Sequence, residues 1–203
     1  MSESRIALTF DAEHGSRPGA HPDAPARILD ALAEASVRAT FFVQGRWATA
    51  QPELALRIAR DGHLVGNHSN YHAPMTLLSP AGVRADVEEA QRRIVSVTGV
   101  DPRPWFRCPF GDGADDPAIL AALADLGYAD VAWDVDSADW HEDATAESVL
   151  SVVIERAGDG GDPGIVLFHT WPAATADAMP RLLAGLSRLG ATFVPLEDLV
   201  DVA

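Results

Sequence analysis

The chain has 203 residues, of which 47% are hydrophobic and 22% charged, a composition typical of a globular domain with a full core. The formal net charge of -15 argues against a general binder of nucleic acid or of anionic membranes, because phosphate contacts need clustered basic residues. The lone Cys108 excludes an internal disulfide and a structural zinc site built from cysteines.

The N-terminal residues pass directly into an apolar run, without the basic segment and longer apolar stretch of a signal peptide. No apolar run is long enough to cross a bilayer, so no membrane insertion is expected. The chain as given is therefore predicted to be cytoplasmic, or else a mature fragment whose leader has been removed. A single catalytic domain is expected over residues 1–203.

Short apolar runs alternate with amphipathic segments along the chain. The apolar runs predict strands at 6–10, 39–43, 63–66, 105–106, 130–133, 164–168 and 191–194. The amphipathic segments predict helices at 25–37, 52–61, 79–99, 117–126, 145–157 and 175–189. Alternation of this kind favours right-handed crossovers and an α/β fold, a distorted parallel (β/α) barrel of about seven strands.

Two histidines, His68 and His72, stand four residues apart just after the third predicted strand. If the chain turns helically after Gly66, both imidazoles project to one side. Two neutral imidazoles make half of a tetrahedral zinc site, and a carboxylate from elsewhere would leave one position open for water. A pair of this kind also arises by chance, so its interpretation depends on the other polar residues.

Polar residues with catalytic potential follow the predicted strands in a regular way. They are Asp11, His68, Arg107, Asp136 with Asp139, and His169. In a parallel α/β barrel the carboxyl ends of the strands lie on one face, where active sites are found. This regularity predicts that the residues gather at one site.

Five short motifs contain these residues and occur in a fixed order. They read Thr9-Phe10-Asp11-Ala12-Glu13, His68-Ser69-Asn70-Tyr71-His72, Arg107-Cys108-Pro109-Phe110, Asp136-Ser137-Ala138-Asp139-Trp140 and Leu167-Phe168-His169. The ordered set resembles the polysaccharide deacetylases of the NodB-homology type, carbohydrate esterase family 4. Each motif alone is weak evidence for the family, but the five motifs in this order are specific to it.

The first motif departs from the family pattern. The resemblance implies two adjacent carboxylates, the first a general base and the second a metal ligand, whereas Ala12 stands in the second place. Glu13, one residue later and one methylene longer, is the expected substitute, and His14 is a weaker one. Two alternatives stay open. Asp11 could bind the metal while Glu13 acts as the base, or the metal could be bound weakly or not at all.

The resemblance implies hydrolysis of an N-acetyl or O-acetyl group with a zinc-type divalent ion, Zn²⁺ or another transition metal such as Co²⁺ or Ni²⁺. Glu13, His68 and His72 are the implied metal ligands. Asp11 is the implied base, which takes a proton from the attacking water. Arg107 is implied to lie against Asp11, where its positive charge keeps the base ionised.

Further roles follow from the same resemblance. The backbone N–H of Phe110 would help to hold the tetrahedral oxyanion, and His169 would protonate the leaving group. Asp139 would lie against His169 and favour its protonated form. The side chains expected to contact the substrate are Trp140, Trp171 and Tyr71.

The sequence thus predicts a metal-dependent hydrolase that removes acetyl groups from N-acetylated sugars, namely chitooligosaccharide, peptidoglycan or a related glycan. Acetylxylan is a further option, because the same machinery cleaves esters. Two alternatives stay open. The altered first motif allows an amidohydrolase of small molecules, working without metal. A non-catalytic saccharide-binding relative would be favoured by loss of the base or the acid, yet Asp11 and His169 are both present.

Overall fold

The computed structural model describes residues 5–13, 15, 19–158 and 164–200. Its contacts divide the chain into two compact units. The first comprises Met1–Phe10, Gly15–Thr40 and Trp133–Asp201, and the second Asp11–His14, Phe41–Ala132 and Val202–Ala203. Strand β1 (Arg5–Ala12) passes from the first unit into the second. The single catalytic domain over residues 1–203 stays a prediction.

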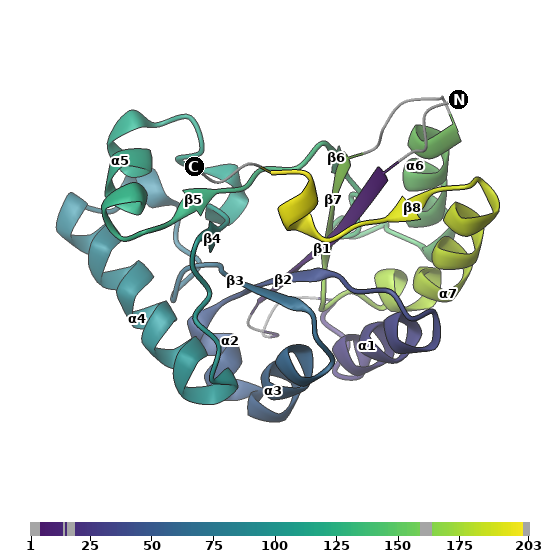
Figure 1. Ribbon diagram of the computed structural model, residues 1–203, viewed down its shortest axis with the longest axis horizontal. Coiled ribbons are helices and arrows are strands. Elements are labelled where there is room, and N and C mark those ends of the chain that lie inside the picture. The colour runs from purple at the N-terminus through teal and green to yellow at the C-terminus, as the bar shows by residue number, and fades with distance from the viewer. Residues whose placement is uncertain (1–4, 14, 16–18, 159–163, 201–203) are drawn as a thin grey trace. The chain divides into compact units, whose positions relative to one another are not determined.

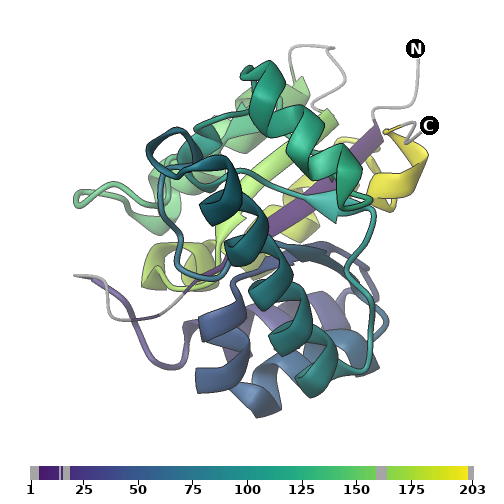
Figure 2. The same ribbon diagram turned by 90° about the vertical axis from the view of Figure 1, so that its left-hand side faces the viewer.

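The second unit contains the end of β1 and most of the helices of the first half of the chain. Its strands follow the order β5-β4-β3-β2-β1, and the β3–β4 and β4–β5 pairs are parallel. Helix α4 packs against α2, α3, α5 and β3 (Figure 1, Figure 2). The elements are β2 (Thr40–Val43), α2 (Gly45–Ala50), α3 (Pro52–Arg60), β3 (Leu64–Asn67), α4 (Pro80–Thr98), β4 (Trp105–Phe106), α5 (Pro117–Asp125) and β5 (Ala129–Asp130), with 3-10 turns at Met75–Leu77 and Pro109–Gly111.

The first unit contains the start of β1 and the C-terminal third of the chain. Its strands follow the order β1-β7-β6, and β8 pairs with β1 in parallel. Thr9 donates its hydroxyl to the carbonyl of Val166 at 2.7 Å, which ties β1 to β7. Helix α7 packs against α1 and α6 (Figure 1). The elements are α1 (Ala24–Glu34), β6 (Val135–Asp136), α6 (Ala146–Gly158), β7 (Gly164–His169), α7 (Ala173–Arg188) and β8 (Thr192–Phe193), with a 3-10 turn at Leu196–Asp198.

Helix α4 shows how directly the sequence specifies these elements. Ser79 caps its N-terminus by accepting a hydrogen bond from the N–H of Gly82, and Pro80 occupies the first turn. The helix ends at Gly99, whose φ of 74° lies in the left-handed region that glycine adopts easily. Among the helices of the described residues, none is both long and apolar enough to span a membrane.

The strand predicted at 130–133 is wrong, because the chain forms two short strands, β5 and β6, in its place. The side chain of Arg107 explains the interruption. Its Nε donates to the carbonyl of Val131 at 3.0 Å and its Nη2 to the carbonyl of Ala132 at 3.3 Å. These two carbonyls bind a side chain rather than a neighbouring strand, so no ladder continues through them. Asp136 therefore lies within β6 instead of following a strand.

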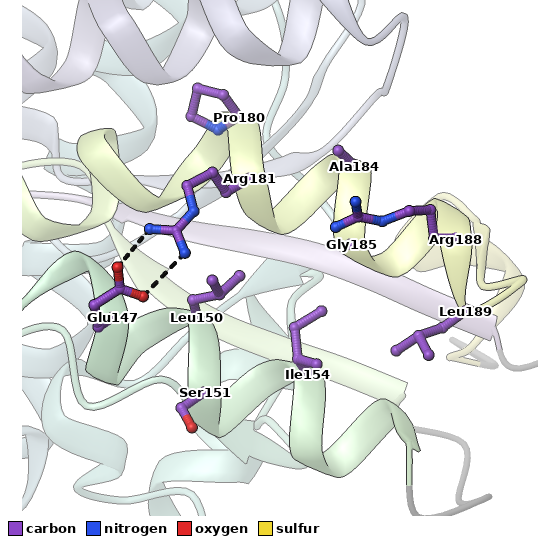
Figure 3. A pocket seen from close by; sticks show the side chains of 10 residues that line it. All are labelled: Glu147, Leu150, Ser151, Ile154, Pro180, Arg181, Ala184, Gly185, Arg188 and Leu189. Carbon is purple, nitrogen blue, oxygen red and sulfur yellow. Dashed lines mark hydrogen bonds and ion pairs between the residues drawn. The ribbon is translucent and has the colours of Figure 1, made fainter.

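Helices α6 and α7 form a groove of about 800 Å³ within the first unit (Figure 3). Glu147 on α6 and Arg181 on α7 join the two helices through contacts of 2.6 and 3.1 Å. Gly185 allows a close approach, because a Cβ there would lie 2.9 Å from the side chain of Ile154. None of the residues that line this groove belongs to the five motifs.

Candidate metal centre and active-site residues

Two carboxylates, Asp11 and Glu13, stand at the C-terminal end of β1, and both are buried. Successive residues of a strand point to opposite faces, so residues two apart share one. Asp11 Oδ2 lies 3.4 Å and Glu13 Oε1 3.8 Å from Nε2 of His68. The spacing Asp-x-Glu thus directs two carboxylates to one imidazole, with Ala12 between them. His14 lies outside the described residues.

The segment between His68 and His72 is a loop, so the helical turn that would direct both imidazoles to one side is absent. Ser69 and His72 have φ angles of 61° and 57°, in the left-handed region. The two imidazoles converge all the same, with ring centroids 4.8 Å apart. Strand β3 continues through Asn67, so His68 follows the strand directly.

Glu13, His68 and His72 form a group that could hold a metal ion. Their ligand atoms all lie within 4.8 Å of one another, and Glu13 Oε1 is 2.9 Å from Nε2 of His72. Two imidazoles and a carboxylate are the ligands of many catalytic zinc sites.

The hydrogen bond of His68 supports this fit. Nδ1 of His68 donates to the carbonyl of Arg107 at 2.9 Å, which in the neutral ring leaves a lone pair on Nε2. Nε2 makes no hydrogen bond within the described residues, although two carboxylates face it. Acceptors that face each other in a buried site need a proton or a cation between them. Histidines that bind metal typically donate their other N–H to a carbonyl in this way.

Arg107 forms a buried ion pair with Asp11. Its Nη1 donates to Asp11 Oδ1 at 3.0 Å, and only 1% of the residue is exposed. The guanidinium also lies 4.1 Å from the centroid of the Phe42 ring. Burial lowers the pKa of Arg107 and Asp11 counteracts it, but an arginine remains a cation in proteins. The contact implied by the family resemblance is therefore present.

The carboxylates also act on His68. Burial by itself would lower the pKa of this imidazole, but Asp11, Glu13 and the carbonyl of Arg107 together raise it above the ordinary 6.5. In protein without metal, the protonated ring thus stabilises the fold. A raised pKa gives a stabilisation that is fully present below the unfolded value and is lost as pH rises through the folded value.

We therefore expect chelator-treated protein to lose stability, relative to a His68→Gln variant, as pH rises from about 6.5. Thermal unfolding of both proteins across this range measures the difference. Metal-loaded protein should show the opposite trend, because protons compete with the cation for the imidazole. If the difference in unfolding temperature between the two proteins does not change with pH, the raised pKa of His68 is contradicted.

The first unit holds a second polar group, around Asp139. His169, the last residue of β7, donates its backbone N–H and Nδ1–H to the two oxygens of Asp139, both at 2.7 Å. Thr175 donates its hydroxyl to the same carboxylate at 2.5 Å. With Nδ1 bound in this way, Nε2 is the ring nitrogen that can give or take a proton. His169 ends the strand rather than following it.

The predicted substrate-binding residues fall into two places. Trp140 and Trp171 both line a cavity of about 310 Å³ in the first unit, next to Asp139. Trp140 is half exposed, and its Nε1 lies 3.3 Å from both carboxylate oxygens of Asp136. Tyr71 is exposed on the loop of the second unit that carries His68 and His72, the candidate metal ligands.

Phe110 lies in the second unit, in the 3-10 turn Pro109–Gly111. Its φ of 59° is left-handed, and its ring lies 4.4 Å from that of His72, centroid to centroid. The contact places Phe110 beside the candidate metal ligands. Whether its N–H serves an oxyanion stays a prediction.

Three buried polar residues near these groups were not predicted: Asn67, Asp86 and Thr175. Asn67 accepts from the N–H of Ser69, and Asp86 accepts from the N–H groups of Asn70 and Tyr71. For Asp86 a signal exists in the sequence, because an acid among the apolar positions of an amphipathic helix is seldom buried without a partner. Asn67 and Thr175 carry no comparable signal.

The comparison with known families matches a polysaccharide deacetylase model to residues 1–131. The chain belongs to the polysaccharide deacetylase family. A chitooligosaccharide deacetylase from Bradyrhizobium is 35% identical over 204 residues, covering 96% of this chain and 90% of the relative. Peptidoglycan-N-acetylmuramic acid deacetylase PdaA from Bacillus subtilis is 30% identical over 200 residues, covering 98% of this chain and 72% of the relative.

Solved structures of the polysaccharide deacetylase family have the same fold. A carbohydrate esterase family 4 pseudoenzyme from Bacillus anthracis is 27% identical, with a TM-score of 0.85, and the match covers 98% of this chain and 66% of the other. The fold class predicted from the sequence, the parallel α/β fold of the NodB-homology type, is confirmed. The predicted family is confirmed too, and with it the enzyme class of polysaccharide or oligosaccharide N-deacetylases.

Proposed function

We propose that this protein is a metal-dependent deacetylase of N-acetylated sugars, acting on chitooligosaccharide, peptidoglycan or a related glycan. The observation that carries the proposal is the convergence of Glu13, His68 and His72 within 4.8 Å. Beside them lies Asp11, a carboxylate paired with a buried arginine. The substrate class is supported by the relatives, which are named as deacetylases of chitooligosaccharide and peptidoglycan.

Glu13, His68 and His72 would hold the cation, Zn²⁺ or another divalent transition metal such as Co²⁺ or Ni²⁺. When bound, the cation would polarise the acetyl carbonyl and lower the pKa of water. Asp11 would accept a proton from the attacking water, while Arg107 pairs with its Oδ1. Burial of both partners keeps their interaction strong.

His169 would protonate the departing amine. Its Nδ1 donates to Asp139, which fixes the orientation of the ring. Thr175 and the backbone N–H of His169 hold the same carboxylate in place. The cavity lined by Trp140 and Trp171 is large enough for a sugar ring or an acetyl group, and their aromatic faces suit the apolar face of a sugar.

The likeness to a pseudoenzyme favours a second candidate function, non-catalytic binding of a saccharide. A mutant of that pseudoenzyme has restored enzymatic activity and the same TM-score of 0.85 to this chain. Asp11 and His169 are both present here, which supports catalysis. The altered first motif, with Ala12 in the second place, keeps a metal-free amidohydrolase of small molecules as a third candidate.

Acetate release separates these candidates. We expect acetate from chitooligosaccharides or peptidoglycan fragments, loss of activity after chelation, and recovery on addition of Zn²⁺, Co²⁺ or Ni²⁺. Release from small acetamides alone, unaffected by chelator, would establish the amidohydrolase instead. Saccharide binding by calorimetry without any acetate release, even with added metal, would establish the non-catalytic relative.

A further inference from the structure

The loop from His68 to His72 holds a conformation that its own residues do not favour. The left-handed φ angles of Ser69 and His72 are strained, because neither residue is glycine. Contacts within the loop and with the rest of the second unit offset this strain. Within the loop, the N–H of His72 donates to Oγ of Ser69 at 2.9 Å. The carbonyl of Ser69 accepts from the N–H of Gly45 at 3.0 Å, and the N–H of Ser69 donates to the side chain of Asn67 at 2.9 Å.

One carboxylate holds the middle of the loop. Asp86 accepts from the N–H of Asn70 through Oδ2 at 2.8 Å and from the N–H of Tyr71 through Oδ1 at 3.2 Å. Asp86 is only 7% exposed, and hydrogen bonds to a buried carboxylate are among the stronger ones. Two of the three residues that separate His68 from His72 are thereby bound to a single side chain.

Asp86 is in turn fixed by its helix. α4 presents Val83, Val87 and Ala90 to the core on the same face as Asp86. The side-chain amide of Asn67, the residue before His68, donates to the carbonyl of Val87 at 3.1 Å. A rigid helix therefore carries the group that sets the loop.

We propose that Asp86 is a positioning residue for the metal centre. Its carboxylate fixes the backbone between His68 and His72, and so the separation and orientation of their imidazoles toward Glu13. The proposal rests on the proposed function, because it requires that these residues bind a cation. Groups that orient metal ligands are typically worth about 10- to 100-fold in affinity. Asp86 lies outside the group of candidate ligands and outside the five motifs.

Asp86→Asn tests the proposal with little change in shape. The amide offers one acceptor and turns an NH₂ group toward a backbone N–H, so one of the two hydrogen bonds is lost. We expect the affinity for Zn²⁺, measured by competition with a chromophoric chelator, to fall about 10- to 100-fold. The visible absorption of bound Co²⁺ should also change, since it reports ligand geometry. Acetate release should recover at saturating metal.

Two further variants separate position from charge and from general stability. Asp86→Glu keeps the charge but displaces it by a methylene, and it should weaken metal binding as well. Glu88→Ala removes the same charge from the same helix at an exposed position, where Glu88 lies 4.0 Å from Arg92. This control should bind metal as the wild type does. Thermal unfolding of each metal-free protein shows whether it is folded.

The outcomes distinguish this inference from the proposed function. Wild-type affinity and an unchanged Co²⁺ spectrum in both Asp86 variants would overturn the inference alone. That result would leave Asp86 as a stabilising contact, even if the unfolding temperature falls. A wild-type protein that binds no metal would overturn the proposed function and this inference with it.

Discussion

Replacement of Asp11 by Asn is expected to lower the rate of acetate release by about 10²- to 10⁴-fold and to leave the metal content unchanged. The amide cannot accept the proton of the attacking water, whereas it retains the size of the carboxylate. Asp11 is not a member of the group formed by Glu13, His68 and His72, so the cation should remain bound. Acetate assays and elemental analysis of dialysed protein measure the two quantities.

The substitution also leaves Arg107 without its anionic partner. Breaking a buried ion pair from one side commonly costs about 3–5 kcal/mol, so the unfolding temperature should fall. The carbonyls of Val131 and Ala132 still accept from the guanidinium, which limits the loss. Activity must therefore be compared below the onset of unfolding of the variant. Loss of bound metal in Asp11→Asn would assign Asp11 to the cation and leave Glu13 as the base.

The sequence predicted the elements, and the contacts between site residues within each unit, better than it predicted backbone detail. Strand alternation explains why Asp11 and Glu13 reach one imidazole, and this depends only on neighbouring residues. The family resemblance implied the pairs Arg107–Asp11 and His169–Asp139, and the structure contains both contacts. Such features are local, or are repeated throughout a family.

The errors arise where a distant side chain sets the backbone. The loop that contains the left-handed residues Ser69 and His72 is bonded to Gly45 and Asp86, and neither of these lies in the motif itself. The strand predicted at 130–133 is interrupted because Arg107 binds its carbonyls. A periodic pattern shows which residues are apolar, but it cannot indicate which backbone carbonyl will accept a hydrogen bond from a side chain distant in the sequence.

Removal of the Glu13 side chain should have the second large effect, on metal binding. Glu13→Ala takes away one of three candidate ligands, and we expect the affinity for metal to fall by about 100-fold or more. This loss exceeds the one typical of residues that only orient a ligand. Activity without added metal should fall with it. Chelator competition gives the affinity, and acetate release at increasing metal concentration shows how far saturation restores the rate. Glu53→Ala, which removes an exposed acid from the first turn of α3, is the matched control and should bind metal normally.

Combining Glu13→Ala with His72→Ala tests whether both side chains act on one cation. Two residues that bind the same cation do not act independently. His72→Ala should therefore weaken metal binding less in the Glu13→Ala protein, whose site is already weakened, than in the wild type. The contact of 2.9 Å between Glu13 and His72 makes this coupling expected from geometry. Independent, additive losses would mean that the two residues serve different sites. Full metal affinity in Glu13→Ala would instead mean that Asp11 replaces the carboxylate missing at Ala12, and the Asp-x-Glu spacing would then have another purpose.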